Sequence, residues 1–169
     1  MKKTVLTYGL ISGVIAAALL LAHVPFMDGG TRSLIVGYAG ILLSALLIFF
    51  GVRSYRDNVG NGRISFGRAF AVGILIALIS AACYVAAWEV VYYSSPGIAD
   101  HIFDKQVEDL KAAGASQEKI DQTAREVESF KKLYANPFVN IAFTFIEPLP
   151  VGLLMSLISA AVLRRNGSG

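Results

Sequence analysis

Long apolar runs separated by short polar stretches dominate the pattern of this chain. Nearly continuous apolar segments cover residues 4–23, 34–52, 66–93 and 138–163. Each is long enough to cross a hydrocarbon core of about 30 Å as a helix that rises 1.5 Å per residue. The pattern therefore predicts an all-α integral membrane bundle of four transmembrane helices.

The stretch 96–135 differs, because its apolar residues recur only at the spacing of an amphipathic helix. Its two halves meet at Gly114, and Ser116 is placed to cap the second half. We expect an extramembrane helical hairpin whose apolar stripes lie against the outer membrane face or the span ends. A coiled-coil arm is the alternative, although the stripes are about one heptad too short to favour it. Val127 and Tyr134 lie on these stripes and are our candidates for a partner-facing surface.

Composition agrees with lipid as the main solvent of this chain. Charged residues make up 16% of the sequence and hydrophobic residues 55%, whereas a soluble domain has about 25% charged residues. The 169 residues fit a single membrane domain over 1–165, with a flexible end at 166–169. The net charge of +3 comes from bases grouped at span ends, so we expect no nucleic-acid partner.

Basic residues form three clusters, at the start of the chain, in the segment 53–68 and at Arg164–Arg165. Short loops rich in Lys and Arg stay on the cytoplasmic side of a membrane. With four spans, all three clusters agree on cytoplasmic N and C termini, which puts the hairpin on the outer side. Trp88 and the pair Tyr92–Tyr93 then predict an aromatic belt at the outer boundary.

Small residues repeat along two of the predicted spans. Gly9 and Gly13 form a GxxxG motif in the first span, and Gly73, Ala77 and Ala81 recur every fourth residue in the third. Such faces let helix backbones approach closely in lipid. We interpret both as packing surfaces within the chain, because nothing in the motif requires a dimer.

Glu147 is the most informative polar residue of the apolar runs. It lies ~16 Å along the fourth span from Asn136, near the middle of the bilayer. A charged side chain there costs about 2.5–3.5 kcal/mol, so it should face the bundle interior or water. Pro148 and Pro150 remove two amide donors and break the helix beside it.

Asn140 and Thr144 share a helical face with Glu147 and extend it as a polar stripe. One reading is structural: Glu147 donates a hydrogen bond to Ser80, Tyr84 or a freed carbonyl. A second is a proton or cation site, and a third is a site for a basic residue of a partner. Candidate ligand or ion-binding residues are therefore Glu147, Glu89, Thr144 and Asn140.

Signals for catalysis are weak. The sequence has no HExxH, GxSxG or CxxC motif, and Cys83 is its single cysteine. His101, Asp104 and Glu108 share one face of the hairpin, which we interpret as solvated charge and not as a metal site. We expect no cofactor, no metal and no enzyme activity. A pair of Glu89 and Glu147 would be the one acid–base candidate.

Several motifs occur together along the chain. They are Gly62–Phe70 (GRISFGRAF), the set Tyr84, Trp88, Glu89, Tyr92 and Tyr93, then Leu110–Ser116 (LKAAGAS), Tyr134–Pro137 (YANP), Glu147–Pro148, Pro150–Leu153 and Ser156–Ala160. In combination they resemble one family, the uncharacterised bacterial membrane proteins called domain of unknown function 4199. The resemblance covers nearly the whole chain and implies a four-helix protein of the bacterial inner membrane. It implies no activity, so no catalytic residue is carried over.

Three functions remain open from the sequence. The favoured one is an accessory or structural protein that binds a protein partner or forms a homo-oligomer through its hairpin. The second is a proton- or cation-coupled transporter, or a subunit of one, that uses Glu147. The third is a lipid-acting enzyme, which would need Glu89 and Glu147 to converge on one pocket.

Overall fold

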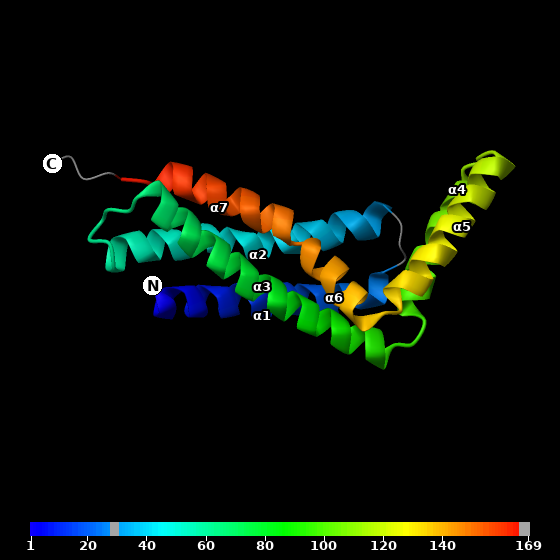
Figure 1. Cartoon of the computed structure of the whole chain (residues 1–169), viewed down its shortest axis with the longest axis horizontal. Coiled ribbons are helices and arrows are strands. Elements are labelled where there is room, and N and C mark those ends of the chain that lie inside the picture. The colour runs from blue at the N-terminus through cyan, green and yellow to red at the C-terminus, as the bar shows by residue number, and fades with distance from the viewer. Residues whose placement is uncertain (28–30, 166–169) are drawn as a thin grey trace.

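The protein is a bundle of long helices with two shorter helices across one end (Figure 1). The computed structural model describes residues 1–27 and 31–165. Every regular element in these ranges is helical, apart from one isolated β-bridge between Ile64 and Arg165, so the predicted all-helical class is confirmed. The elements are α1 (Lys2–His23), the 3-10 turn η1 (Val24–Phe26), α2 (Thr31–Asn58), α3 (Phe66–Ser94), α4 (Ile98–Ala112), α5 (Gln117–Tyr134), α6 (Pro137–Ile146) and α7 (Leu149–Leu163).

Four helical segments within the described residues are long and apolar enough to cross a membrane, as predicted. The fourth is made of two helices, α6 and α7, that meet at Glu147 and Pro148. The four segments are Lys2–Phe26, Arg32–Asn58, Phe66–Ser94 and Pro137–Leu163.

The second span continues beyond the predicted 34–52, because α2 runs to Asn58. Arg53 and Asp57 form an i,i+4 ion pair at 3.7 Å, and the Asn58 amide donates to the Ser54 carbonyl at 3.0 Å. These contacts add side-chain support to the polar last turns of the helix. The predicted turn residues 28–30 and the predicted flexible end 166–169 lie outside the described residues.

α1 and α3 approach each other through the glycines of the first span. A Cβ atom added at Gly13 would lie 2.6 Å from the Cβ of Cys83, and one at Gly9 would lie 2.8 Å from the Cβ of Ile79. Both distances are too short for real carbon atoms, so only glycine fits. The GxxxG motif therefore serves packing within the chain, as we interpreted it from the sequence.

α3 meets α7 in the same manner. A Cβ atom at Gly73 would lie 3.0 Å from the Cβ of Ser156, and one at Gly152 would lie 2.8 Å from the Cβ of Ala77.

Between α1 and α2, buried Ser12 adds a polar contact, since its hydroxyl donates to the Ser44 carbonyl at 2.8 Å. Close packing and such hydrogen bonds hold helices together where lipid supplies no hydrophobic driving force between them.

α4 and α5 run side by side across the end of the bundle that lies away from the chain termini (Figure 1). Gly114 has a φ of 69° in the connection, a left-handed conformation that glycine adopts without strain. The Ser116 hydroxyl caps α5 by accepting from the Lys119 amide at 3.4 Å. Lys131 on α5 donates to Asp104 on α4 at 2.7 Å, which joins the two helices.

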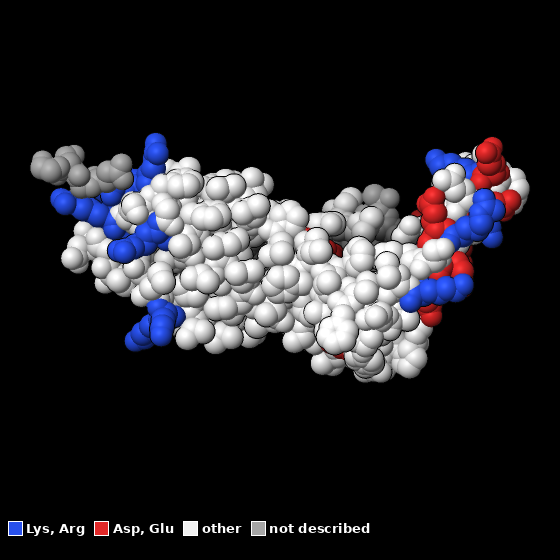
Figure 2. Space-filling model, in the orientation of Figure 1, with Lys and Arg blue, Asp and Glu red and all other residues white. Residues whose placement is uncertain are grey.

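Charge is distributed along the long axis of the molecule in three zones (Figure 2). Lys and Arg gather at the end that carries Lys3 and Arg165, and acids and bases mix over α4 and α5. On the face shown, the surface between these zones is almost free of charged side chains. This is the charge pattern of a protein whose middle section is solvated by lipid.

The glycine packing generates a first prediction, for Gly13→Ala. The added methyl group must displace Cys83 on α3, and overpacking of this kind costs about 1–3 kcal/mol. We expect a lower unfolding temperature of the detergent-solubilised protein, measured by circular dichroism.

Gly67→Ala is the matched control, because a Cβ atom at Gly67 on α3 meets nothing within 4 Å. It should leave stability unchanged or raise it by up to about 1 kcal/mol, since alanine favours a helix over glycine. If Gly13→Ala instead preserves the unfolding temperature and dissociates an oligomer, the motif packs between chains.

Candidate functional site

The break in the fourth span places Glu147. Proline lacks an amide hydrogen and its ring clashes with the carbonyl four residues earlier, so Pro148 and Pro150 interrupt the helical ladder. α6 accordingly ends at Ile146 and α7 begins at Leu149. The Glu147 amide still donates to the Phe143 carbonyl at 3.2 Å, which fixes the last turn of α6. Its carboxylate therefore stands at the corner between two helices.

A cavity of about 290 Å³ lies at this corner, between the bundle and the hairpin. α3 contributes Tyr84 and Trp88, and α6 contributes Thr144 and Glu147. The ends of α1 and α2 close another side, while α4 and Tyr134 of α5 cover the cavity from the hairpin. The lining is mainly apolar with a few convergent polar groups, which is the usual make-up of a small-molecule site.

Glu147 is held by one side chain of α3. The Tyr84 hydroxyl donates to a carboxylate oxygen of Glu147 at 3.3 Å. Tyr84 was one of the partners expected from the sequence, but it donates to Glu147 and does not accept from it, whereas Ser80 bonds to Ser12 of α1 at 3.0 Å. Glu147 is surrounded by several helices but opens onto the cavity, so the residue as a whole is exposed.

A buried hydrogen-bond network lies beside the cavity and joins three elements. The Trp88 indole N–H donates to the Tyr134 hydroxyl at 2.8 Å and to the Asn140 side-chain oxygen at 3.2 Å. The Thr144 hydroxyl donates to the same Asn140 oxygen at 3.3 Å and also lies 3.3 Å from the Tyr134 hydroxyl. Burial raises the pKa of the Tyr134 phenol, so this group stays neutral and can serve as donor and acceptor. The network fastens α5 and α6 to α3.

The predicted polar stripe on α6 is therefore divided between different tasks. The Asn136 side chain caps α6 by accepting from the Phe138 amide at 3.0 Å. Asn140 and Thr144 belong to the network, and Glu147 faces the cavity. Asn140 is completely buried, and its amide nitrogen has no partner among the described residues.

Glu89 does not join Glu147. It is not among the residues that line the cavity, and one of its carboxylate oxygens is buried without a partner among the described residues. The two carboxylates therefore do not line this cavity together. Pro148 and Pro150 act as expected, as breakers of the helix.

Val127 and Tyr134, expected to face a partner, instead lie inside the protein. Both are only 8% exposed. Tyr134 packs with its ring 5.2 Å from that of Phe103 on α4 and 6.0 Å from that of Tyr92 on α3. These two residues of the apolar stripe on α5 are covered by contacts within the chain, because α4 and α6 pack against α5.

Two features of the site were missed from the sequence. Trp88, expected in an interfacial belt, is buried in the network, while Tyr93 is exposed. His23 at the end of α1 is also buried, with Nε2 3.2 Å from the Ser33 hydroxyl. The short connection between the first two spans was the one available signal for the contact between His23 and Ser33, since it brings the ends of two antiparallel helices together.

Within residues 1–27 and 31–165, no three His, Cys, Asp or Glu side chains are close enough together to hold a metal ion. Asp104 is engaged by Lys131 at 2.7 Å, and Glu108 lies 3.5 Å from Lys105. Both carboxylates of this face thus lie beside lysines of the hairpin.

Comparison with known proteins decides the family. The family model described as "Protein of unknown function (DUF4199)" matches residues 7–165. The chain belongs to the DUF4199 family. No curated protein and no solved structure matches it. The family match of this DUF4199 protein begins within α1 and covers all the later helices, so the broken fourth span, the hairpin and the cavity between them lie within the family region.

The network generates a second prediction, for Tyr134→Phe. The substitution keeps the ring but removes the nearer of the two acceptors of the Trp88 N–H, so the buried network loses a hydrogen bond worth about 1 kcal/mol. We expect faster cleavage of the hairpin in limited proteolysis and a lower unfolding temperature.

Tyr93→Phe is the control, since Tyr93 is exposed and belongs to the neighbouring turn of α3. It should leave both measurements unchanged. Equal behaviour of the two variants would mean that the network does not hold the hairpin in place.

Proposed function

We propose that this DUF4199 protein is a multi-spanning accessory protein of the bacterial inner membrane, which acts by binding a protein partner or a second copy of itself and not by catalysis. In this proposal the N and C termini are cytoplasmic and residues 96–135 form a periplasmic hairpin. The basic zone at the end with Lys3 and Arg165 supports that orientation (Figure 2).

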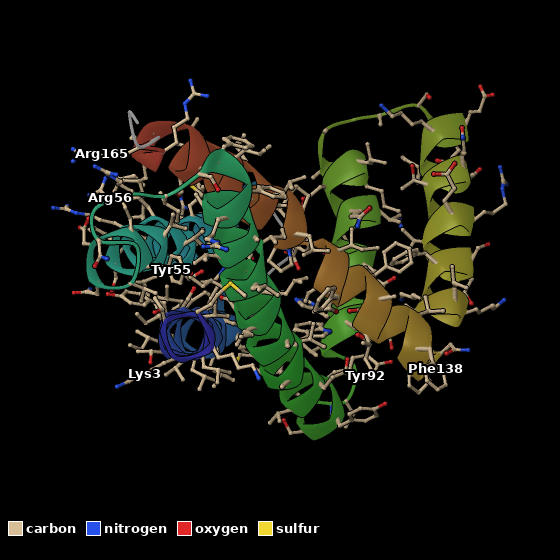
Figure 3. All side chains as sticks on the ribbon, turned by 60° about the vertical axis from the view of Figure 1, so that its left-hand side comes forward. Lys3, Tyr55, Arg56, Tyr92, Phe138 and Arg165 are labelled. Atoms are coloured by element: carbon tan, nitrogen blue, oxygen red, sulfur yellow. The ribbon has the colours of Figure 1, made fainter. Side chains whose placement is uncertain are left out.

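The observation that carries the proposal is the firm attachment of the hairpin. Phe130 of α5 packs with its ring 5.1 Å from that of Phe143 on α6, and Tyr134 bonds to Trp88. The hairpin is therefore presented at a set angle to the bundle (Figure 3). A surface that is already ordered loses less conformational entropy when it binds, which suits a docking element.

The surface offered to the partner differs from the one expected at first. Since Val127 and Tyr134 are buried, we assign the role to exposed apolar residues at the base of the hairpin. Leu133 on α5 is 50% exposed, and Phe138 in the first turn of α6 is 84% exposed. Figure 3 shows Phe138 at the outer edge of α6.

A third prediction tests this surface through Leu133→Gln. The protein is solubilised gently from its native membrane, and co-purifying chains are measured by size analysis and mass spectrometry. We expect a partner at fixed stoichiometry whose recovery falls about tenfold in the variant, as for an apolar interface residue worth about 1.4 kcal/mol.

Val59→Gln is the matched control, because Val59 is 49% exposed and lies between α2 and α3 at the opposite end. It should retain the partner in full. A protein that purifies alone as a monomer, or variants that lose the partner equally, would refute the accessory proposal.

A second candidate function is proton- or cation-coupled transport, and a specific observation favours it. Glu147 borders a cavity at a helix break, where Pro148 and Pro150 leave the carbonyls of Thr144 and Ile146 without helical donors. Broken helices that line a cavity are common ion sites in transporters. Four spans are few for a transport pathway, so this function would require a dimer or a partner subunit.

A fourth prediction separates this candidate from a structural role of Glu147. In reconstituted vesicles with an imposed proton or sodium gradient, Glu147→Gln should reduce ion flux at least about tenfold if the carboxylate carries the ion. Glutamine still accepts the Tyr84 hydrogen bond, so folding should be preserved.

Glu89→Gln serves as the control, since Glu89 is a carboxylate of α3 that does not line the cavity. Its flux should equal that of the unmodified protein. Unchanged flux in the Glu147→Gln protein would remove the transport function and leave Glu147 as a hydrogen-bonding link between helices.

A further inference from the structure

A second cavity lies at the end of the bundle away from the hairpin. It has a volume of about 450 Å³ and is formed where the connection between α2 and α3 meets the end of α7. Three arginines line it, namely Arg63, Arg68 and Arg165. No acidic residue is among its lining residues.

The fold holds these arginines in place through backbone contacts. The Ile64 amide donates to the Arg165 carbonyl at 3.3 Å, and the Arg165 amide donates to the Ile64 carbonyl at 3.0 Å. The end of the fourth span is thereby tied to the connection between α2 and α3. Ser65 caps α3 by accepting from the Arg68 amide at 3.4 Å, which fixes the start of that helix beside the cavity.

Glycine shapes the same connection. A Cβ atom at Gly60 would collide with the Arg63 carbonyl oxygen, and Gly62 has a φ of 78°, in the left-handed region. Gly60 and Gly62 therefore allow the backbone conformation of the turn that carries Arg63, and this conformation does not depend on a ligand. Tyr55, 6% exposed, supports the cavity from α2 (Figure 3).

The charges in the cavity are not used within the described part of the chain. Asp57 is taken by Arg53 at 3.7 Å and by Arg56 at 2.7 Å. Among residues 1–27 and 31–165, no ion pair reaches Arg63, Arg68 or Arg165. The orientation of the protein in a membrane accounts for positive charge at this end, but it does not explain why three arginines surround one cavity.

We propose that this cavity binds a phosphate group, and specifically the headgroup phosphate of an anionic phospholipid. The cavity lies where α2 ends and α3 begins, and the membrane orientation proposed above puts these span ends at the depth of lipid headgroups. Guanidinium groups bind phosphate oxygens through paired hydrogen bonds, and the capped start of α3 adds favourable backbone amides. Basic pockets between span ends are a known form of anionic-lipid site.

The test measures binding of phosphatidylglycerol and of phosphatidylcholine to the full chain in detergent, by native mass spectrometry. The double variant Arg63→Gln/Arg68→Gln is compared with Lys2→Gln/Lys3→Gln, which removes two positive charges from the same end outside the cavity. Arg165→Gln and Arg164→Gln form a second pair, since Arg164 does not line the cavity. Each variant is first checked for a native unfolding temperature.

We expect phosphatidylglycerol to bind in preference to phosphatidylcholine. Its affinity should fall at least about tenfold in Arg63→Gln/Arg68→Gln and in Arg165→Gln, because charge-assisted hydrogen bonds are lost. Both control variants should keep it within about threefold. If the double variant fails to fold, the pair Arg165→Gln and Arg164→Gln decides the result.

A competition arm distinguishes the source of the phosphate. If inorganic phosphate fails to displace the lipid when chloride of equal ionic strength also fails, the ligand is the lipid headgroup. If phosphate alone displaces it, the cavity serves a soluble phosphate compound, and the lipid part of the proposal is overturned. Equal loss of binding in the cavity variants and their controls, or equal binding of the two lipids, overturns the phosphate site itself.

Discussion

The close approach of α1 and α7 to α3 is the constraint on which the other features depend. At Gly9, Gly13 and Gly73 the neighbouring helices leave no room for a Cβ atom. In lipid, apolar side chains gain little by leaving their solvent, so contact between backbones replaces the hydrophobic effect as the source of cohesion. α3 is therefore the central helix of the bundle. Trp88 near one of its ends belongs to the buried network, and Arg68 near the other lines the basic cavity.

Only about half of the fourth span approaches α3 this closely. α7 packs closely on α3 through Gly152, whereas α6 diverges at Glu147 and Pro148 and reaches the hairpin. The divergence opens the space that the cavity occupies. Polar residues lie between α6 and α3, and hydrogen bonds there take the place of tight backbone packing. Trp88, Asn140 and Thr144 supply them.

The sequence allowed the spans, the cap at Ser116 and the break beside Glu147 to be predicted, because each depends on local pattern or proline chemistry. Tyr84 was found as a partner of Glu147 for a related reason, since few polar groups lie at its depth. The burial of Trp88 and Tyr134 could not be predicted. It depends on how α5 and α6 are angled against α3, and aromatic side chains with a polar tip suit an interface and a buried seam equally well.

The chain of contacts from hairpin to helix break has a mechanical consequence. Phe130 and Tyr134 couple α5 to α6 at Phe143 and Thr144, while α6 meets α7 only at the proline corner. The hairpin and α6 therefore form one lever, and its pivot is the corner that bears Glu147. A force applied at the far tip, near Gly114, would therefore act on the two places where α6 is bonded to α3, the Trp88–Asn140 and Tyr84–Glu147 hydrogen bonds.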